Sequence, residues 1–243
     1  MENVKKFSII SAVIVALLII IYNQAIKEGK FTCNNFVLNT YLYLILAIML
    51  ISAFILQFED IPISEISKKY IFVMILSFIS LFGIIFFETN LLISHLLWVM
   101  FIACMAYMMV PLTNLLNRNK VLTKTLISTF MTLVLLTLFV YKYPEYVSLN
   151  MHSTLMVLLF SGIIVQLVNY IFETQYTDKI STLLSYGFIV LFSFFILYDT
   201  KMLKIKATLC HAKGINPNYP RDSLNIFLDI INLFTNFGKI YSK

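Results

Sequence analysis

Two aspartates lie inside segments of this chain that are otherwise almost entirely apolar. Asp199 occurs in FFILYDT, near the end of one such segment, and Asp229 occurs in SLNIFLDIINLF, the run at residues 223–234. A charged side chain at the centre of a membrane helix costs about 2.5–3.5 kcal/mol on insertion scales, and charges that persist there are usually functional. The carboxyl groups of Asp199 and Asp229 are therefore the first candidates for chemistry.

The two aspartates are also each other's candidate partner. No lysine or arginine occurs at a comparable depth in the apolar segments. Two carboxylates that meet in a low-dielectric site cannot both ionise easily, and they share a proton. When both are deprotonated, they offer the hard oxygen ligands that Ca²⁺ prefers. The sequence therefore predicts a pH switch, a transient Ca²⁺ site, or both at Asp199 and Asp229.

Asp229 belongs to a regular series of polar residues. The series consists of Asp222, Asn225, Asp229, Asn232 and Asn236, with spacings of 3, 4, 3 and 4. This spacing places all five on one side of a helix. Since lipid cannot satisfy amide and carboxyl groups, this side must face protein or water. The pattern favours a helix at the centre of a bundle, with Asn225, Asn232 and Asn236 supporting Asp229. A helix lying on the membrane surface remains the alternative.

The composition indicates which elements hold these residues. The chain is 60% hydrophobic and 12% charged, whereas a soluble domain is about 45–50% apolar and about 25% charged. Apolar stretches of about 17–25 residues are long enough to cross a hydrocarbon core of roughly 30 Å. Helices are predicted at 7–24, 36–57, 70–87, 91–113, 121–142, 149–172 and 182–202, with a shorter one at 223–240. The predicted fold class is an all-α polytopic membrane protein with short connections and antiparallel neighbours.

The first apolar segment has two interpretations. A basic start followed at once by residues 7–24 is compatible with a cleaved signal peptide or with an uncleaved anchor helix. The run is long for a signal peptide and no A-x-A cleavage site follows it, which favours the anchor. Residues 1–30 are therefore predicted to form an extra N-terminal transmembrane helix, and residues 31–243 the main membrane domain.

The remaining polar residues predict topology rather than catalysis. The net charge of +6 comes mostly from lysines at helix ends, so no nucleic-acid partner is predicted. Lys and Arg divide equally between the two sides until Lys239 and Lys243 are placed, which requires knowing whether the last segment crosses the membrane. The densest basic cluster, at 201–221, is predicted to be cytosolic. No metal-ligand constellation, catalytic triad or phosphate loop is present, so neither an enzyme nor a cofactor is predicted.

Two further expectations concern local structure. Cys33, Cys104 and Cys210 are far apart and odd in number, and they predict neither a disulfide framework nor a metal site. Pro217 and Pro220 are expected to end any helix before the last segment, and Asp222 is expected to cap that segment's first turn.

The aspartate-containing motifs also carry a resemblance. ILYDT followed by SLNIFLDIINLF resembles the C-terminal signature of the Bax inhibitor-1 (transmembrane Bax inhibitor motif) family, especially its Golgi anti-apoptotic protein and lifeguard branches, over residues 188–237. The resemblance implies six helices, from 36–57 to 182–202, around a central helix at 223–240. It also implies that Asp199 and Asp229 form a pH-sensitive sensor that gates a Ca²⁺ leak across an intracellular membrane.

The resemblance leaves two functions open. One is a pH-sensitive Ca²⁺ leak channel of the ER or Golgi membrane (the inner membrane if the source is bacterial) that restrains cell death. The other is a membrane protein without transport that binds Bcl-2-type proteins or Ca²⁺-release channels through its helices. Several members carry an arginine that pairs with the aspartates, but 70–87 contains no basic residue. The abundance of Ile, Asn, Lys and Phe indicates an AT-rich genome, that of a large DNA virus or a microbe.

Overall fold

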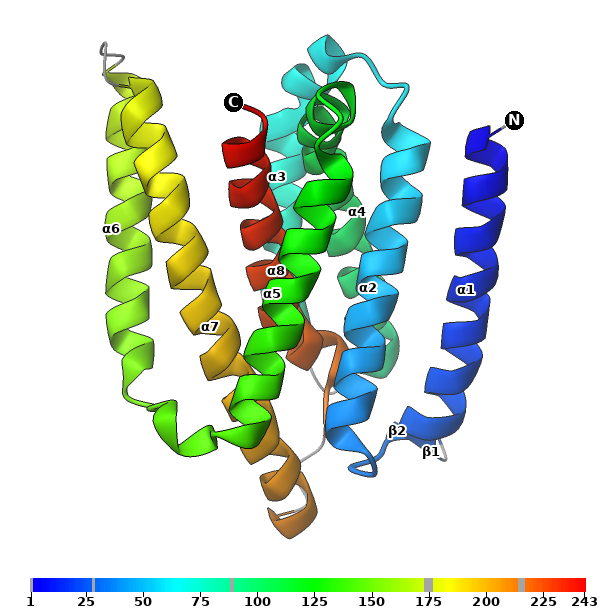
Figure 1. Cartoon of the computed structure of the whole chain (residues 1–243). Helices are drawn as coiled ribbons and strands as arrows, with labels where there is room; N and C mark the ends of the chain where they lie inside the picture. The colour runs from blue at the N-terminus through cyan, green and yellow to red at the C-terminus, as the bar shows by residue number, and fades with distance from the viewer. Residues whose placement is uncertain (1, 28, 88–89, 173–176, 214–216) are drawn as a thin grey trace. The chain divides into compact units, whose positions relative to one another are not determined.

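Eight α-helices contain most of the residues that the structure describes. The computed structural model describes residues 2–27, 29–87, 90–172, 177–213 and 217–243 (Figure 1). The elements are α1 (Glu2–Ala25), β1 (Ile26–Lys27), β2 (Lys30–Phe31), α2 (Phe36–Phe58), α3 (Ile63–Phe86), α4 (Leu91–Arg118), α5 (Leu122–Lys142), the 3₁₀-helix η1 (Pro144–Tyr146), α6 (Met151–Ile171), α7 (Thr177–Lys213) and α8 (Tyr219–Tyr241).

Seven of these helices, α1 to α7, are long and apolar enough to cross a membrane, as judged by length and composition within the described residues. The prediction of an all-α polytopic membrane protein is confirmed. The eighth helix, α8, is not among the seven, and side chains from all round its circumference are buried along most of its length. This burial argues against the alternative of a helix that lies on the membrane surface with one face in water.

The end of α7 and the start of α8 differ from the sequence prediction. At 37 residues α7 is about 55 Å long, so the basic stretch after residue 202 is helical. α8 begins at Tyr219, four residues earlier than expected. Asn218 Oδ1 accepts a hydrogen bond from the Arg221 backbone N–H at 3.0 Å. The predicted cap at Asp222 is therefore wrong, because the helix already begins at Tyr219. Pro220 is compatible with this start, since a residue in the first turn of a helix needs no backbone donor.

A second difference concerns the cysteines. Cys33 and Cys210 form a disulfide across a sequence separation of 177 residues, with their Cα atoms 5.7 Å apart. Cys104 is buried and free. The expectation of no disulfide is therefore wrong. It rested on spacing along the chain, which carries no information about a pairing that the tertiary fold creates.

The chain divides into two compact units. The first consists of Met1–Asn114 and Lys206–Phe227, and the second of Leu115–Ile205 and Leu228–Lys243. Three helices, α4, α7 and α8, contribute residues to both. The predicted division into 1–30 and 31–243 followed the transmembrane spans rather than compactness, and it stays a prediction.

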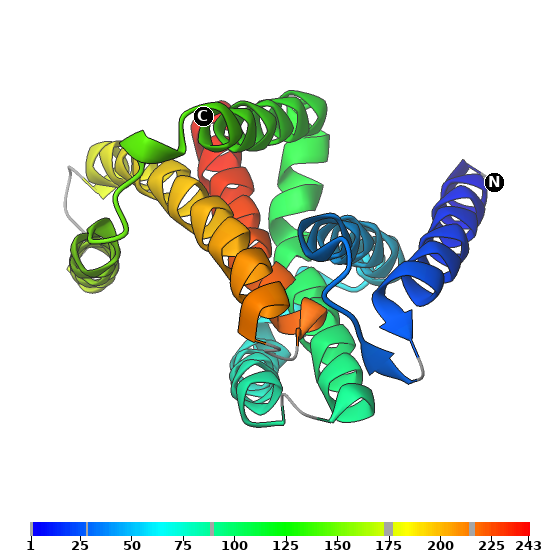
Figure 2. The same cartoon turned by 90° about the horizontal axis from the view of Figure 1, so that it is seen from below.

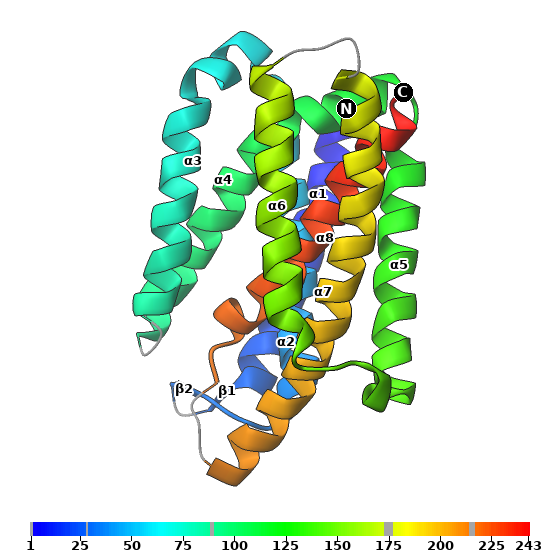
Figure 3. The same cartoon turned by 90° about the vertical axis from the view of Figure 1, so that its left-hand side faces the viewer.

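In the first unit, α1 packs beside α2, and the two are joined through a short hairpin (Figure 2). The hairpin pairs Ile26 with Phe31 and Lys27 with Lys30, and Gly29 takes a left-handed conformation in its turn, with φ of +73°. α3 and α4 lie side by side as an antiparallel pair (Figure 3). A methyl group on Gly83 of α3 would approach Leu97 of α4 to 2.7 Å, so glycine permits this close approach.

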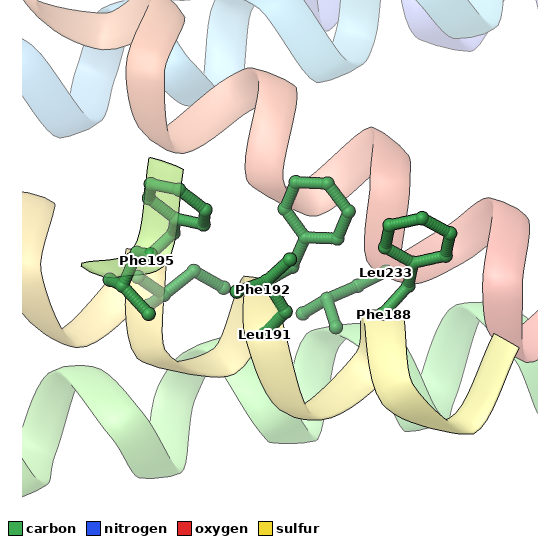
Figure 4. Packing of buried hydrophobic residues seen from close by; sticks show 7 residues of the cluster. Phe188, Leu191, Phe192, Phe195 and Leu233 are labelled. Atoms are coloured by element: carbon green, nitrogen blue, oxygen red, sulfur yellow. The ribbon is translucent and has the colours of Figure 1, made fainter. Parts of the chain in front are cut away.

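In the second unit, α6 and α7 lie side by side (Figure 3), and a hydrophobic core forms around α7. The core consists of Leu155 from α6, Phe188, Leu191, Phe192, Phe195 and Ile196 from α7, and Leu233 from α8 (Figure 4). The α7 members recur at spacings of three and four, as expected for one buried face of a helix. The direction of this buried face determines which of the following α7 residues can contact α8.

Candidate functional site

The core of the second unit positions the two aspartates. Asp199 comes three and four residues after Ile196 and Phe195, so it continues the same buried face of α7. Asp229 comes one turn before Leu233 on α8, whose side chain belongs to the same core. The helical repeat of both elements therefore directs the two carboxyl groups toward each other at the end of an apolar core.

The structure brings Asp199 and Asp229 into direct contact. Their side chains are hydrogen-bonded to each other. Asp229 is only 6% exposed, whereas Asp199 is half-buried. An ionised carboxylate has acceptors only, so a hydrogen bond between two carboxyl groups requires that one of them carries a proton. The geometry is therefore that of a pair with one shared proton.

The second carboxyl oxygen of Asp229 is unsatisfied. Asp229 Oδ2 is buried and has no hydrogen-bond partner among the described residues. A buried polar atom without a partner costs on the order of 1–3 kcal/mol. Such an atom needs an explanation, for which a bound cation or an entering water is the natural candidate.

No cation neutralises Asp229 in the part of the chain that the structure describes. The lysines that follow Asp199 on α7 are engaged elsewhere. Lys201 Nζ donates to the backbone oxygen of Val147 at 2.6 Å, and Lys204 Nζ lies 4.8 Å from the ring centroid of Tyr141. The shared proton, rather than a basic side chain, is therefore what compensates Asp229.

The polar series on α8 is only partly assembled around this pair. The Asn232 amide donates to Leu228 O at 2.9 Å, and the Asn236 amide donates to Asn232 O at 2.8 Å. Asn236 is buried and its Oδ1 has no partner among the described residues. Asn225 is exposed, so the structure does not bring it to the aspartates. The helical spacing determines the direction in which the Asn225 side chain points. Whether that side chain is buried depends on the elements that pack against α8 at this position.

Two further residues lie beside Asp199 in the sequence or against its neighbour Tyr198 in the structure. Thr200, next to Asp199, is fully buried, and its hydroxyl has no partner among the described residues. His152 at the start of α6 stacks on Tyr198, with centroids 4.9 Å apart and an interplanar angle of 21°. Its Nδ1 is buried without a partner in the described part of the chain. From the sequence alone, a histidine near the start of a helix is interpreted as a residue of the membrane interface. The stacking on Tyr198 is visible only in the tertiary structure.

The pair alone is a sparse metal site. Within the described residues, no group of three or more His, Cys, Asp and Glu side chains could hold a metal ion. Ca²⁺ takes six to eight oxygen ligands, so the two carboxyl groups would need water and other oxygens to complete its coordination. This arrangement suits brief contact with a passing cation better than stable storage.

α3 extends beyond the predicted range of 70–87 and contains basic residues near its start. α3 begins at Ile63 and so includes Lys68 and Lys69 in its first two turns. Lys69 Nζ is 2.6 Å from Glu65 Oε1 in an exposed ion pair. α3 belongs to the first unit, whereas both aspartates belong to the second.

Comparison with known proteins gives one match. The family described as "Inhibitor of apoptosis-promoting Bax1" matches residues 33–243, which leaves out all of α1 and the β1–β2 hairpin and includes both aspartates. No significant match was found among curated proteins or among solved structures. The match covers most of the chain, and the chain therefore belongs to the Bax inhibitor-1 family.

Proposed function

We propose that this protein is a pH-sensitive Ca²⁺ leak channel that restrains cell death, with the Asp199–Asp229 pair as its gate. Membership of the Bax inhibitor-1 family supports an anti-apoptotic membrane protein, and seven apolar helices support a multi-pass location in a bilayer. The finer proposal is a transport role, rather than catalysis, in the ER or Golgi membrane.

The observation that carries the proposal is the hydrogen bond between two carboxyl groups, one of them almost fully buried. While one proton is shared, the pair carries a single negative charge and its members attract. When that proton leaves, two adjacent carboxylates repel each other in a low-dielectric site. Since no basic side chain pairs with Asp229 in the described chain, the deprotonated pair separates, and it then offers its oxygens to Ca²⁺.

This mechanism fixes the sign of the pH dependence. The shared proton holds the closed arrangement, so the leak is low at acid pH and rises as the pH increases through the range in which the proton dissociates. In a family member that has an arginine beside the aspartates, the positive charge of the arginine would balance the deprotonated pair. In this chain 70–87 supplies no such charge. The absence of a basic residue in 70–87 is therefore part of the proposed gating.

The test is Ca²⁺ flux into vesicles reconstituted with the full-length protein. We expect the wild-type flux to rise with increasing pH, because the proton that holds the closed arrangement then leaves the pair. Asp199→Asn and Asp229→Asn should each make the flux independent of pH, since an amide cannot share or release the proton. Asp178→Asn is the matched control, because Asp178 is an exposed carboxylate at the start of the same helix.

A wild-type flux equal to that of empty vesicles at every pH would exclude the channel. In that case a membrane protein that binds Bcl-2-type proteins or Ca²⁺-release channels without transport becomes the better function. Cell survival after an apoptotic stimulus separates the two functions. Protection by a leak channel should be altered by both Asp→Asn variants, whereas protection through helix–helix binding should survive them.

A further inference from the structure

Two side chains of α8 are buried and carry an acceptor oxygen that nothing satisfies. Asp229 Oδ2 and Asn236 Oδ1 have no hydrogen-bond partner among the described residues, and the two residues are only 6% and 4% exposed. Both belong to Leu228–Lys243, the part of α8 that lies in the second unit. A buried acceptor without a partner is destabilising, so two of them on one helix call for a common explanation.

The two oxygens lie on the same face of α8. Asn236 follows Asp229 by seven residues, which is close to two helical turns, so the two positions differ by about 20° around the helix axis and by about 10 Å along it. Asn232 lies between them on this face and is half-buried. Asp229, Asn232 and Asn236 therefore present side-chain oxygens at three successive levels of one face.

The helix itself fixes the orientation of both amides. Asn232 Nδ2 donates to Leu228 O at 2.9 Å, and Asn236 Nδ2 donates to Asn232 O at 2.8 Å. A rotated amide would set Oδ1 against the same backbone oxygen, which is unfavourable because both atoms are acceptors. In each side chain the nitrogen is thus bound to the helix, and Oδ1 remains as the acceptor.

Packing does not explain the amide at position 236. Its neighbours Leu233, Phe234 and Phe237 are apolar, and Leu233 belongs to the core of the second unit, with Phe237 packed against it. Replacing a polar side chain by an apolar one of the same shape can be nearly neutral or stabilising. An apolar residue would therefore fill this place without leaving a buried acceptor unsatisfied.

The chemistry of this face selects the class of ligand. Carboxylate and amide oxygens are acceptors that bind hard cations such as Ca²⁺. Ca²⁺ binds oxygen at about 2.3–2.6 Å, whereas Asp229 and Asn236 lie at levels about 10 Å apart. One ion therefore cannot be held by both levels, and the two oxygens define two successive contacts.

We propose that Asn236 Oδ1 is a second contact for Ca²⁺, two turns beyond the aspartate pair, and that the ion moves along the face of α8 formed by Asp229, Asn232 and Asn236. The movement of Ca²⁺ rests on the proposed function, whereas binding at Asn236 is testable without transport. Conduction requires several sites that each bind weakly enough to release the ion. A neutral amide meets this requirement better than a second carboxylate.

The end of α8 beyond Asn236 is anchored within the second unit. The Tyr241 and Ser128 hydroxyls share a hydrogen bond of 2.9 Å between α8 and α5, and Lys243 Nζ donates to Asp178 O of α7 at 2.8 Å. These contacts hold the segment that carries Asn236 whether or not the pair is protonated. A change at Asn236 should therefore alter how much Ca²⁺ passes, without altering the response of the pair to pH.

Lys239 is the next charged residue on α8 after Asn236, and it is half-buried. It follows Asn236 by three residues, which places it on the adjoining part of the helix surface, less than one turn further on. Its positive charge repels a cation at Asn236 and so shortens the time for which the ion stays there. A brief stay is what a contact on a permeation path needs.

The first arm of the test measures binding of Ca²⁺ alone. The apparent Tm of the full-length protein in detergent is recorded in chelator and at increasing Ca²⁺, since a ligand that binds the native state raises the Tm. In chelator, Asn236→Leu should have a Tm equal to or above that of the wild type, and its Tm should rise less with Ca²⁺. Asn236→Asp should respond at about tenfold lower Ca²⁺, because a carboxylate adds ligand charge.

The matched control is Asn225→Leu, because Asn225 is an exposed asparagine of the same helix, and its Tm should respond to Ca²⁺ as that of the wild type does. Equal responses of the wild type, Asn236→Leu and Asn236→Asp would overturn the second contact and leave water as the partner of Oδ1. A lower Tm of Asn236→Leu in chelator with an unchanged response would show a structural amide and would also overturn it. Where Asn236→Leu does not fold, the response of Asn236→Asp decides alone.

The second arm measures Ca²⁺ flux in reconstituted vesicles. Asn236→Leu should reduce the flux about fivefold, as expected for the loss of one polar contact, and the flux should still rise with pH because the pair is intact. A variant that loses this pH dependence would assign Asn236 to the gate and overturn a separate contact. A wild type that never leaks would overturn the proposed function, while the first arm still decides whether Ca²⁺ contacts Asn236.

Discussion

The side chains of Asp229 and Asp199 are hydrogen-bonded to each other, while Asp229 Oδ2 is buried without a partner in the described chain. A fully satisfied buried polar network rigidifies a core, whereas a partly satisfied one is where a structure most readily changes. The apolar residues Phe195, Ile196 and Leu233 pack in the adjoining core of α7 and α8. The aspartate pair therefore lies beside a packed apolar core but contains one unsatisfied oxygen, Asp229 Oδ2.

The first prediction concerns the pH dependence of stability. The hydrogen bond between the two carboxyl groups requires one proton in the folded state, whereas the carboxyl groups of the unfolded chain are free to ionise. Since the native state then binds more protons, stability falls as the pH rises until the shared proton leaves. We expect the apparent Tm of the wild type in detergent to fall between pH 5 and pH 8, and that of Asp229→Asn to change less.

Scanning fluorimetry of Trp98, the only tryptophan of the chain, can report this unfolding, because its side chain is buried. Asp178→Asn again serves as the control and should follow the wild type. Parallel curves for the wild type and Asp229→Asn would contradict the shared proton.

A second prediction concerns the ion pair between Lys206 and Asp222. Lys206 Nζ lies 2.5 Å from Asp222 Oδ1, with the lysine side chain 40% exposed and the aspartate side chain 9% exposed. Lys206→Met leaves the carboxylate largely buried without its cation, so we expect a loss of about 1–2 kcal/mol, between the values for exposed and buried pairs. A double-mutant cycle with Asp222→Asn should recover part of the loss. Additive effects of the two variants would show that the pair does not contribute.

A third prediction concerns Tyr43 and His95. His95 Nδ1 donates to Leu91 O at 2.6 Å, so its Nε2 is the acceptor for the Tyr43 hydroxyl at 2.7 Å. Tyr43→Phe leaves Nε2 without its donor and should cost about 1–2 kcal/mol. The Tyr43 ring is 5.7 Å from Trp98, so the tryptophan emission should also change. Tyr22→Phe, at an exposed position of α1, should leave both quantities unchanged.

A fourth prediction compares three glycines. A methyl group on Gly162 would lie 2.8 Å from two ring atoms of Phe188, a rigid member of the core. Gly162→Ala should therefore destabilise the protein by about 1–3 kcal/mol. At Gly83 the contact is with the flexible end of Leu97, and the cost should be smaller. Gly187 has no atom within 4 Å of such a methyl group, so Gly187→Ala should stabilise the helix by up to about 1 kcal/mol. A higher Tm for Gly162→Ala than for Gly187→Ala would contradict this packing.

Local sequence determined the elements and the direction in which their side chains point. Runs of apolar residues fixed seven membrane-length helices, since a backbone in lipid must satisfy its own hydrogen bonds. The spacing of three and four residues set the polar face of α8, and the lack of a basic partner made Asp229 the natural partner of Asp199. The helices and the polar face depend on residues within a few turns of one another, which is why the sequence sufficed to predict them. The pairing of the aspartates was predicted by elimination, since no basic side chain was available to either.

Only the tertiary structure decided which of these side chains meet, which are covered and which remain unsatisfied. Asn225 shares a face with Asp229 but is exposed, because burial depends on the neighbouring elements at each level of the helix. Asp222 pairs with Lys206 instead of capping α8, because the helix starts at Tyr219. Cys33 and Cys210 meet across 177 residues. Contacts between segments so distant in the chain arise from packing, and no local periodicity records them.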